Sequence, residues 1–278
     1  MTETLTIGTG TLAYDVAGEG PLVVLAHGIG DSRHAYRFLA PALVGAGYRV
    51  ATVDLRGCGD SSLGWDGYSR TDIAGDLVAL VRHLGGGPAV VVGQSISGGA
   101  ATIAAATAPD AVAGVVELAP FTRKVSYSLT GLLRVSRYRR GFVLLARTLL
   151  GSRSAWKGYL DLAYPTKPVD WDAELGRIDA KLREPGRMKA LQAMCQASPT
   201  DAGAQLANVR CPVLVVEGDL DPDFVDPRAE GGRILADLPA GLGELVVLEG
   251  VGHYPHAQTP DRLLDVVLPF LARVLPRA

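Results

Sequence analysis

Short runs of hydrophobic residues recur along the first 120 positions, and segments with helical periodicity separate them. Mostly apolar runs occur at 21–27, 48–53, 89–93 and 112–118, which is typical of parallel strands whose two faces are both covered. Apolar residues at helical spacing lie between these runs, at 33–45 and 70–84, and an Ala-rich helical run begins after position 95. This alternation predicts an α/β fold with a mostly parallel, doubly wound sheet.

Elements at both ends of the chain extend this pattern. Residues 4–7 and 11–16 are short β-type runs around a Gly-Thr-Gly turn and predict a hairpin at a sheet edge. Ser69 and Asp72 have capping-box spacing at the start of the helix at 70–84. Further strands are predicted at 211–218 and 244–248, with a helix at 228–238 between them, and Thr259 is expected to cap a final helix that runs to Val274.

The alternation stops between Phe121 and about Ala207. This stretch predicts helices interrupted by four prolines and contains no convincing buried strand. We therefore expect a single domain over residues 1–278, with a core formed by 1–120 and 208–278 and a helical insertion at about 121–207. The apolar face of this insertion could serve a binding pocket or a homodimer.

The first half of the insertion is strongly basic. Ten Lys or Arg residues lie between Phe121 and Lys167 against one acid, Asp161, and four arginines cluster around Tyr138: Arg134, Arg137, Arg139 and Arg140. One interpretation is a solvated helix face. The alternative is a surface that steers an anionic acyl substrate or rests on an acidic surface.

Composition excludes several function classes. The net charge of -2 and pI near 6.2 give no whole-chain electrostatic basis for binding nucleic acid. The three cysteines are widely spaced without CxxC motifs or a His-rich segment beside them, and the chain has only five histidines, so we expect no disulfide framework, metal or cofactor. The first residues do not resemble a signal peptide and no run is long enough to span a membrane, which predicts a cytoplasmic protein.

Ser95 lies where a fully apolar run ends and a helical run begins. A serine hydroxyl is a poor nucleophile unless it is held clear of the backbone, beside a base and near donors for an oxyanion. A sharp strand-to-helix turn achieves this and needs small residues two before and two after the serine, usually as G-x-S-x-G. Here those positions hold Gly93 and Ser97, so the second glycine is replaced by another small residue.

A histidine and a carboxylate follow later strands in the order Ser, Asp, His. His253 comes directly after a glycine-rich turn, and His256 is its rival three residues on. For the acid we favour Asp221, because Asp219 is the better turn residue; Asp223 and Asp226 lie beyond it. Each candidate follows the carboxyl end of a predicted strand, where open α/β sheets place their sites. Ser95, Asp221 and His253 are therefore the predicted catalytic residues.

Two backbone amides are expected to stabilise the oxyanion of the reaction. The amide of Ile96 follows the nucleophile, and the amide of Ile29 lies in the glycine-rich loop after the first buried strand. His27 in the same loop is expected to hydrogen-bond the loop and not to transfer protons. Asp54 and Arg56 are expected to hold a structural loop.

Five motifs in order resemble those of the α/β-hydrolase superfamily, over nearly the whole chain. They are HGIG, DLRGCGDSS, GQSISGG, VEGDLDPD and GVGHYPH, which are similar to the oxyanion loop, the D-x-R-G-x-G-x-S loop, the elbow, the acid loop and the histidine loop of that family. The resemblance implies an eight-stranded, mostly parallel sheet flanked by helices, with the insertion as a lid. Dehalogenases and epoxide hydrolases of the family use Asp as nucleophile, so Ser95 favours acyl transfer to water.

The resemblance implies a serine hydrolase that cleaves a small or medium carboxylic ester or lactone through an acyl-enzyme, with a small molecule as its partner. A carbon-carbon bond hydrolase or a cofactor-free perhydrolase would use the same triad. A third alternative is a ligand-binding receptor with slow hydrolysis, because the Ser-x-Ser elbow resembles the family's signal-receptor branch. Product turnover separates these classes.

Overall fold

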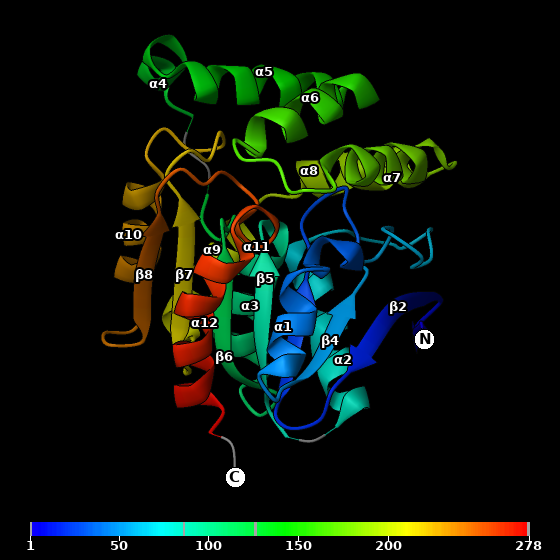
Figure 1. Ribbon diagram of the computed structural model, residues 1–278, viewed down its shortest axis with the longest axis vertical. Helices are drawn as coiled ribbons and strands as arrows, with labels where there is room; N and C mark the ends of the chain where they lie inside the picture. The colour runs from blue at the N-terminus through cyan, green and yellow to red at the C-terminus, as the bar shows by residue number, and fades with distance from the viewer. Residues whose placement is uncertain (1, 86, 125–126, 277–278) are drawn as a thin grey trace.

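The computed structural model describes residues 2–85, 87–124 and 127–276, so the predicted domain ends at residues 1 and 278 lie outside it. One sheet has the strand order β1-β2-β4-β3-β5-β6-β7-β8 (Figure 1). Only β2 runs against the other strands described, because it pairs antiparallel with both β1 and β4. The strands are β1 (Glu3–Ile7), β2 (Gly10–Ala17), β3 (Leu22–Ala26), β4 (Arg49–Val53), β5 (Ala89–Gln94), β6 (Val112–Leu118), β7 (Val213–Gly218) and β8 (Gly243–Leu248). The mostly parallel sheet and the edge hairpin are confirmed.

Helices cover both faces of the sheet. One face packs on α1 (Leu39–Gly45) and α12 (Pro260–Val274), and the other on α2 (Arg70–Leu84), α3 (Ile96–Thr107) and α10 (Pro227–Asp237) (Figure 1). Successive residues of β3 alternate between the two cores: Val23 and Leu25 join one, while Leu22 and Val24 join the other. This two-sided burial is the reason that the central strands are mostly apolar.

Six α-helices lie between β6 and β7 in the described part of residues 121–207, which we call the helical insertion. They are α4 (Leu129–Arg134), α5 (Ser136–Leu149), α6 (Arg153–Ala163), α7 (Trp171–Arg183), α8 (Arg187–Gln196) and α9 (Thr200–Gly203), followed by the 3-10 helix η2 (Leu206–Asn208). The described residues of this stretch contain no strand, as predicted. In Figure 1, α4 to α8 lie above the carboxyl ends of the strands. No helix in the described parts of the chain is both long and apolar enough to cross a bilayer.

The helix predicted over 33–45 is divided. A 3-10 turn, η1 (Arg33–Tyr36), is capped by the Ser32 hydroxyl, and α1 starts afresh at Leu39. Proline lacks an N–H and is favoured in the first turn of a helix, whereas in the interior it removes a backbone hydrogen bond. The restart places Pro41 at the third position of α1, where a continuous helix would have placed it in the interior.

Thr259 precedes α12 as predicted, but its side chain makes no capping bond. A capping side chain needs an extended backbone at the cap residue, as Ser69 has with ψ 165° in the confirmed capping box with Asp72. Thr259 instead has ψ 61°, because the short helix α11 (Pro255–Gln258) leads directly into α12. The predicted cap at Thr259 is therefore wrong.

Candidate active site

Ser95 lies in a strained turn between β5 and α3. Its backbone has φ 56° and ψ -118°, a conformation that side-chain-bearing residues rarely adopt. A Cβ at Gly93 would lie 2.2 Å from the Ser97 carbonyl oxygen, so this close approach of strand and helix requires glycine. Strain of this kind concentrates at functional positions, where it holds a side chain in a defined direction.

Ser97 fills the position of the missing second glycine. It is fully buried, and its hydroxyl donates a hydrogen bond of 2.6 Å to the His27 carbonyl oxygen at the end of β3. The replacement is therefore accommodated, and it ties the start of α3 to the neighbouring strand.

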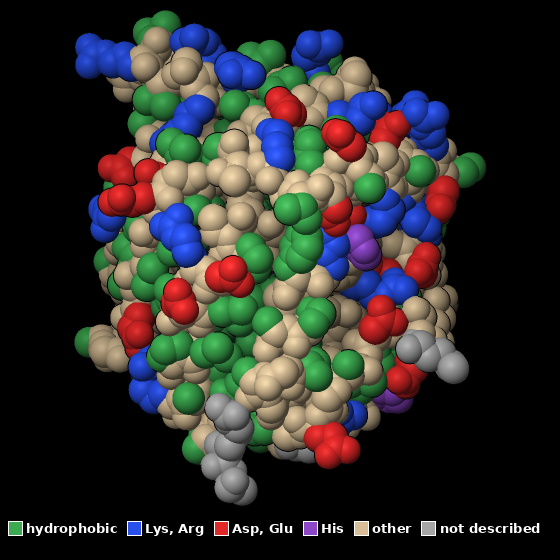
Figure 2. Space-filling view, in the orientation of Figure 1, with side chains coloured by type: hydrophobic (Ala, Val, Ile, Leu, Met, Phe, Trp, Pro, Cys, Tyr) green, Lys and Arg blue, Asp and Glu red, His purple; other side chains and the backbone are tan. Residues whose placement is uncertain are grey.

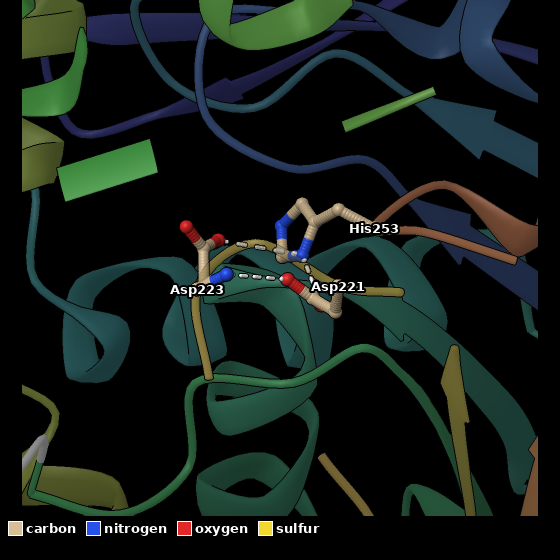
Figure 3. Close-up of side chains that lie close together, drawn as sticks. All are labelled: Asp221, Asp223 and His253. Atoms are coloured by element: carbon tan, nitrogen blue, oxygen red, sulfur yellow. Dashed lines mark hydrogen bonds and ion pairs between the residues drawn. The ribbon is translucent and has the colours of Figure 1, made fainter. Parts of the chain in front are cut away.

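His253 and Asp221 form a buried pair at the ends of β8 and β7 (Figure 3). The Nδ1 atom of His253 lies 2.7 Å from Asp221 Oδ2. A proton on Nδ1 that is donated to the carboxylate leaves Nε2 unprotonated and able to accept a proton. The ring is also held through its backbone, since His253 N donates to Ala163 O and its carbonyl accepts from Gln94 Nε2.

The other predicted acids have local structural bonds. Asp219 accepts from the amides of Gly250 and Val251, and Asp226 caps α10 by accepting from Ala229 N. The structure thus brings Asp221, and not these two, to the imidazole.

His256 does not reach an acid in the described structure. It is fully buried against the Tyr36 ring, with ring centroids 4.7 Å apart, and neither ring nitrogen has a partner among the described residues. Burial lowers the pKa of His256 to about 3. These surroundings are those of a neutral packing residue.

Asp223 is a second carboxyl group beside the histidine, a proximity that sequence reasoning missed. Its Oδ2 lies 3.5 Å from His253 Nδ1 (Figure 3). The same oxygen accepts a hydrogen bond of 2.5 Å from the Tyr159 hydroxyl of α6. Its backbone amide donates to Asp221 Oδ1. Burial raises the pKa of Asp223 to about 7; the Asp221 charge adds to this and His253 opposes it.

Replacing Asp223 by asparagine is expected to move the acid limb of the kcat/KM profile to lower pH. Burial alone lowers the pKa of His253, but the charges of Asp221 and Asp223 and the hydrogen bond from Asp221 raise it above the ordinary value. A general base works unprotonated, so activity falls as pH drops through this pKa. Removing one of the charges that raise the pKa lowers it. Profiles of both proteins between about pH 5 and pH 9 test this; coincident limbs would contradict it.

The two amides predicted for an oxyanion are free in the structure. Neither Ile29 N nor Ile96 N donates to an acceptor within the described residues. A Cβ at Gly28 would lie 1.9 Å from Gln94 Oε1 and 3.1 Å from Ser95 Cβ, so the loop after β3 approaches Ser95 because Gly28 has no side chain. Both amides therefore lie on segments next to the serine.

His27, Asp54 and Arg56 hold loops, as predicted. His27 Nδ1 bonds Gly28 O at 2.6 Å and Nε2 accepts from Leu55 N, while burial lowers the pKa of the ring. Asp54 accepts from Asp60 N and from Arg33, and Arg56 makes a two-point contact with Asp76. These side chains fix the loops that surround the site.

Ser95, His253 and Ile29 line one cavity of about 380 Å³, a size typical of small-ligand sites. The insertion supplies a largely apolar wall, which includes Phe142, Leu145, Leu149, Trp156 and Tyr159. No hydrogen bond joins the Ser95 hydroxyl to His253 in the described structure; such bonds are often long before substrate binds. A wider hollow of about 830 Å³ near α10 is lined by neither Ser95 nor His253.

The basic residues of the insertion take different places. Arg137 donates to four carbonyl oxygens of the loop that holds Asp221, those of Asp219, Asp221, Phe224 and Val225. It therefore braces the predicted acid. Arg134, Arg139 and Arg140 are exposed, and Figure 2 shows Lys and Arg side chains along the upper part of the molecule, over the insertion. None of these four arginines lines the cavity, so steering by them stays a prediction.

One group of described side chains has metal-ligand spacing. Ligand atoms of Asp221, Asp223 and His253 all lie within 4.8 Å of one another. His253 Nδ1 is the atom bonded to Asp221, so a cation bound there would replace that hydrogen bond. The donor set fits a hydrogen-bonded acid and base better than a metal centre.

Comparison with known proteins supports the fold described above. A family model described as the alpha/beta hydrolase family matches residues 23–266. A 2-(acetamidomethylene)succinate hydrolase from Mesorhizobium japonicum is 30% identical over 274 residues, which cover 95% of this chain and 93% of that protein. Epoxide hydrolase B from Mycobacterium tuberculosis is 40% identical over 116 residues, which cover 41% and 33%. An esterase structure from Exiguobacterium antarcticum superposes with a TM-score of 0.78 at 19% identity, over 94% and 96% of the two chains.

Proposed function

The chain belongs to the alpha/beta hydrolase family, and on that premise we propose that it hydrolyses a small or medium carboxylic ester or lactone through an acyl-enzyme. The observation that supports this most is Ser95 in a strained turn, in the same cavity as a histidine that is hydrogen-bonded to Asp221. Membership of the family supports hydrolase activity, whereas the ester or lactone substrate is our proposal.

In the proposed reaction, Ser95 Oγ attacks the carbonyl carbon while His253 Nε2 takes its proton. The oxyanion of the tetrahedral intermediate accepts hydrogen bonds from Ile29 N and Ile96 N. The intermediate collapses as His253 returns the proton to the departing alcohol, which leaves an ester on Ser95. Water, deprotonated by His253, then attacks that ester, and His253 returns the proton to Ser95 Oγ as the acid is released. Asp221 stabilises the imidazolium in both halves, and the insertion acts as the lid over the cavity.

Ser95 argues against epoxide opening, although several relatives are epoxide hydrolases. The family resemblance implies an Asp nucleophile for that reaction, and the residue at the elbow here is serine. The similarity to a 2-(acetamidomethylene)succinate hydrolase over 95% of the chain favours a second candidate function. In it, the same three residues cleave an amide or a carbon-carbon bond of a succinate derivative. Both candidates use the same nucleophile and base.

Stopped-flow hydrolysis of p-nitrophenyl acetate and butyrate, followed by a panel of esters and lactones, tests the proposal. We expect a burst close to one product per protein, then steady turnover over many cycles, because acylation by an activated ester outruns deacylation. A burst without later turnover would favour the receptor alternative. Neither burst nor turnover on any member of the panel would contradict ester hydrolysis and leave the succinate derivatives to be tried.

A further inference from the structure

Arg70 is a buried cation in the wall of the cavity that contains Ser95. It is the first residue of α2 and is only 3% exposed. Its Nε donates to the Phe121 carbonyl oxygen at 2.7 Å, and its Nη1 donates to the Ala197 carbonyl oxygen at 2.9 Å. Phe121 N in turn donates to Ser95 O at 3.1 Å. The guanidinium group is therefore separated from the predicted nucleophile by a single residue.

The charge of Arg70 is not neutralised by an ion pair. Within the described residues, no carboxylate oxygen lies within 4.0 Å of its guanidinium nitrogens, whereas Arg33, Arg56 and Arg177 each have such a partner. Asp201 attracts Arg70 from a greater distance, but its carboxylate bonds Thr71. Burial lowers the pKa of Arg70 to about 10, so the group stays charged near neutrality. Buried charges ordinarily have partners.

The guanidinium keeps hydrogen-bonding capacity for such a partner. Of its five N–H groups, two are used on carbonyl oxygens, and Nη2 bonds no acceptor in the described part of the chain. Its position at the first residue of α2 is unfavourable as well, because the amino end of a helix carries partial positive charge. A negative group in the cavity would accept the remaining N–H groups and offset the unfavourable charge at the amino end of α2.

We propose that Arg70 binds a carboxylate carried by the substrate, so that the preferred esters or lactones bear a second, anionic group close to the scissile carbonyl. This inference rests on the proposed function. Guanidinium groups match carboxylates in geometry and bond them strongly. In this chain the subsite would lie at the junction of α2, the segment after β6 and the segment between α8 and α9.

Two other charged side chains line the same cavity. Asp223 has its Oδ2 atom bonded to Tyr159 and near His253, so the charge of its ionised form faces the imidazole. Lys124 is exposed, which makes it a rim cation that water solvates. Of the two cations in the cavity wall, Arg70 is the buried one, and it should therefore attract an anion more strongly than Lys124, since desolvated charges interact more strongly.

The test compares p-nitrophenyl esters of glutaric acid and of its monoamide, which have nearly the same shape and differ in charge. We expect wild type to prefer the charged ester after subtraction of spontaneous hydrolysis. Arg70→Gln should lower kcat/KM for the charged ester by about 10- to 100-fold, the range of a lost charge-assisted hydrogen bond, and for the neutral ester by less than about threefold. Arg70→Lys, which keeps the charge, should retain part of the preference.

Matched controls separate this subsite from other causes. Arg139→Gln removes an exposed arginine of α5 outside the cavity, and we expect the charged-to-neutral ratio to stay unchanged. Equal losses on both esters in Arg70→Gln would show that Arg70 only braces the loops and would overturn the inference. A preference lost in Lys124→Gln instead would also overturn it. If Arg70→Gln does not fold, the charged-to-neutral ratio of kcat/KM in wild type and in Arg70→Lys tests the inference.

Binding to Ser95→Ala keeps this inference distinct from the proposed function. Calorimetry should show that this variant binds monomethyl glutarate more tightly than methyl glutaramate. We expect this difference in affinity to be lost when Arg70→Gln is added. If wild type hydrolyses no ester but this binding difference is present, the proposed function is wrong and the anion subsite holds. Equal affinities for the two compounds would contradict the subsite even in an active esterase.

Discussion

Ser95→Ala is expected to abolish both the burst and the turnover of p-nitrophenyl butyrate, with kcat lowered by about 10⁴-fold or more, the loss typical of removing a serine nucleophile. Alanine keeps the Cβ and loses only the attacking oxygen. Since the φ of 56° strains alanine as it strains serine, the variant should fold with a Tm close to that of wild type. Stopped-flow absorbance measures burst and steady state in the same record.

Ser97→Ala is the matched control for Ser95→Ala. Ser97 lies two residues on, is fully buried and donates to the His27 carbonyl oxygen. Its loss should cost about 1 kcal/mol of stability, the usual effect of one buried hydrogen bond, while the burst remains. Turnover that survives in Ser95→Ala at wild-type rate would remove Ser95 from the mechanism and favour a different nucleophile.

The elbow and the sheet could be predicted from sequence because both depend on local constraints. A central parallel strand is largely apolar on both faces, so runs such as 89–93 mark it without knowledge of its neighbours. The turn at Ser95 needs a small residue at position 93, where a Cβ would collide with α3. These constraints appear directly in the residue types.

The break between Arg33 and Gly45 also has a signal in the sequence, which the prediction of a single helix does not use. Apolar spacing alone predicts one helix, whereas Pro41 favours a helix that starts near Leu39, with the proline in its first turn. The proline was a stronger signal than the periodicity. At Thr259 the residue type matched a cap, but the backbone angle that decides capping depends on the preceding helix α11.

The contents of the cavity could not be derived from the chain order. Tyr159 and Asp223 are 64 positions apart, and only the packing of α6 over the end of β7 makes them hydrogen-bond. Amphipathic helices show which of their faces is apolar but not which element they cover. For Arg70 a weak signal existed, because arginine directly after a capping serine opposes the helix dipole.

The choice among four nearby aspartates depended on loop geometry, and its test has the second largest expected effect. Asp221→Asn should lower kcat by about 10³- to 10⁴-fold, as loss of the orienting carboxylate does in comparable triads. Asparagine has almost the same shape, so Asp223 N can still donate to its side-chain oxygen, as it does to Asp221 Oδ1. What is lost is the negative charge at His253 Nδ1, which holds the imidazole tautomer and stabilises its protonated form.

Asp223→Asn and Asp219→Asn complete the comparison with Asp221→Asn. Asp219 bonds only loop amides, so its replacement should leave kcat within about threefold of wild type. Asp223 lies 3.5 Å from His253 Nδ1 against 2.7 Å for Asp221, and we expect its loss to shift the pH profile while kcat at alkaline pH changes little. A larger loss of kcat in Asp223→Asn than in Asp221→Asn would reverse the assignment of the acid. Comparable losses in both would mean that the two carboxyl groups share the charge of the imidazolium, since the shorter contact would then have no advantage.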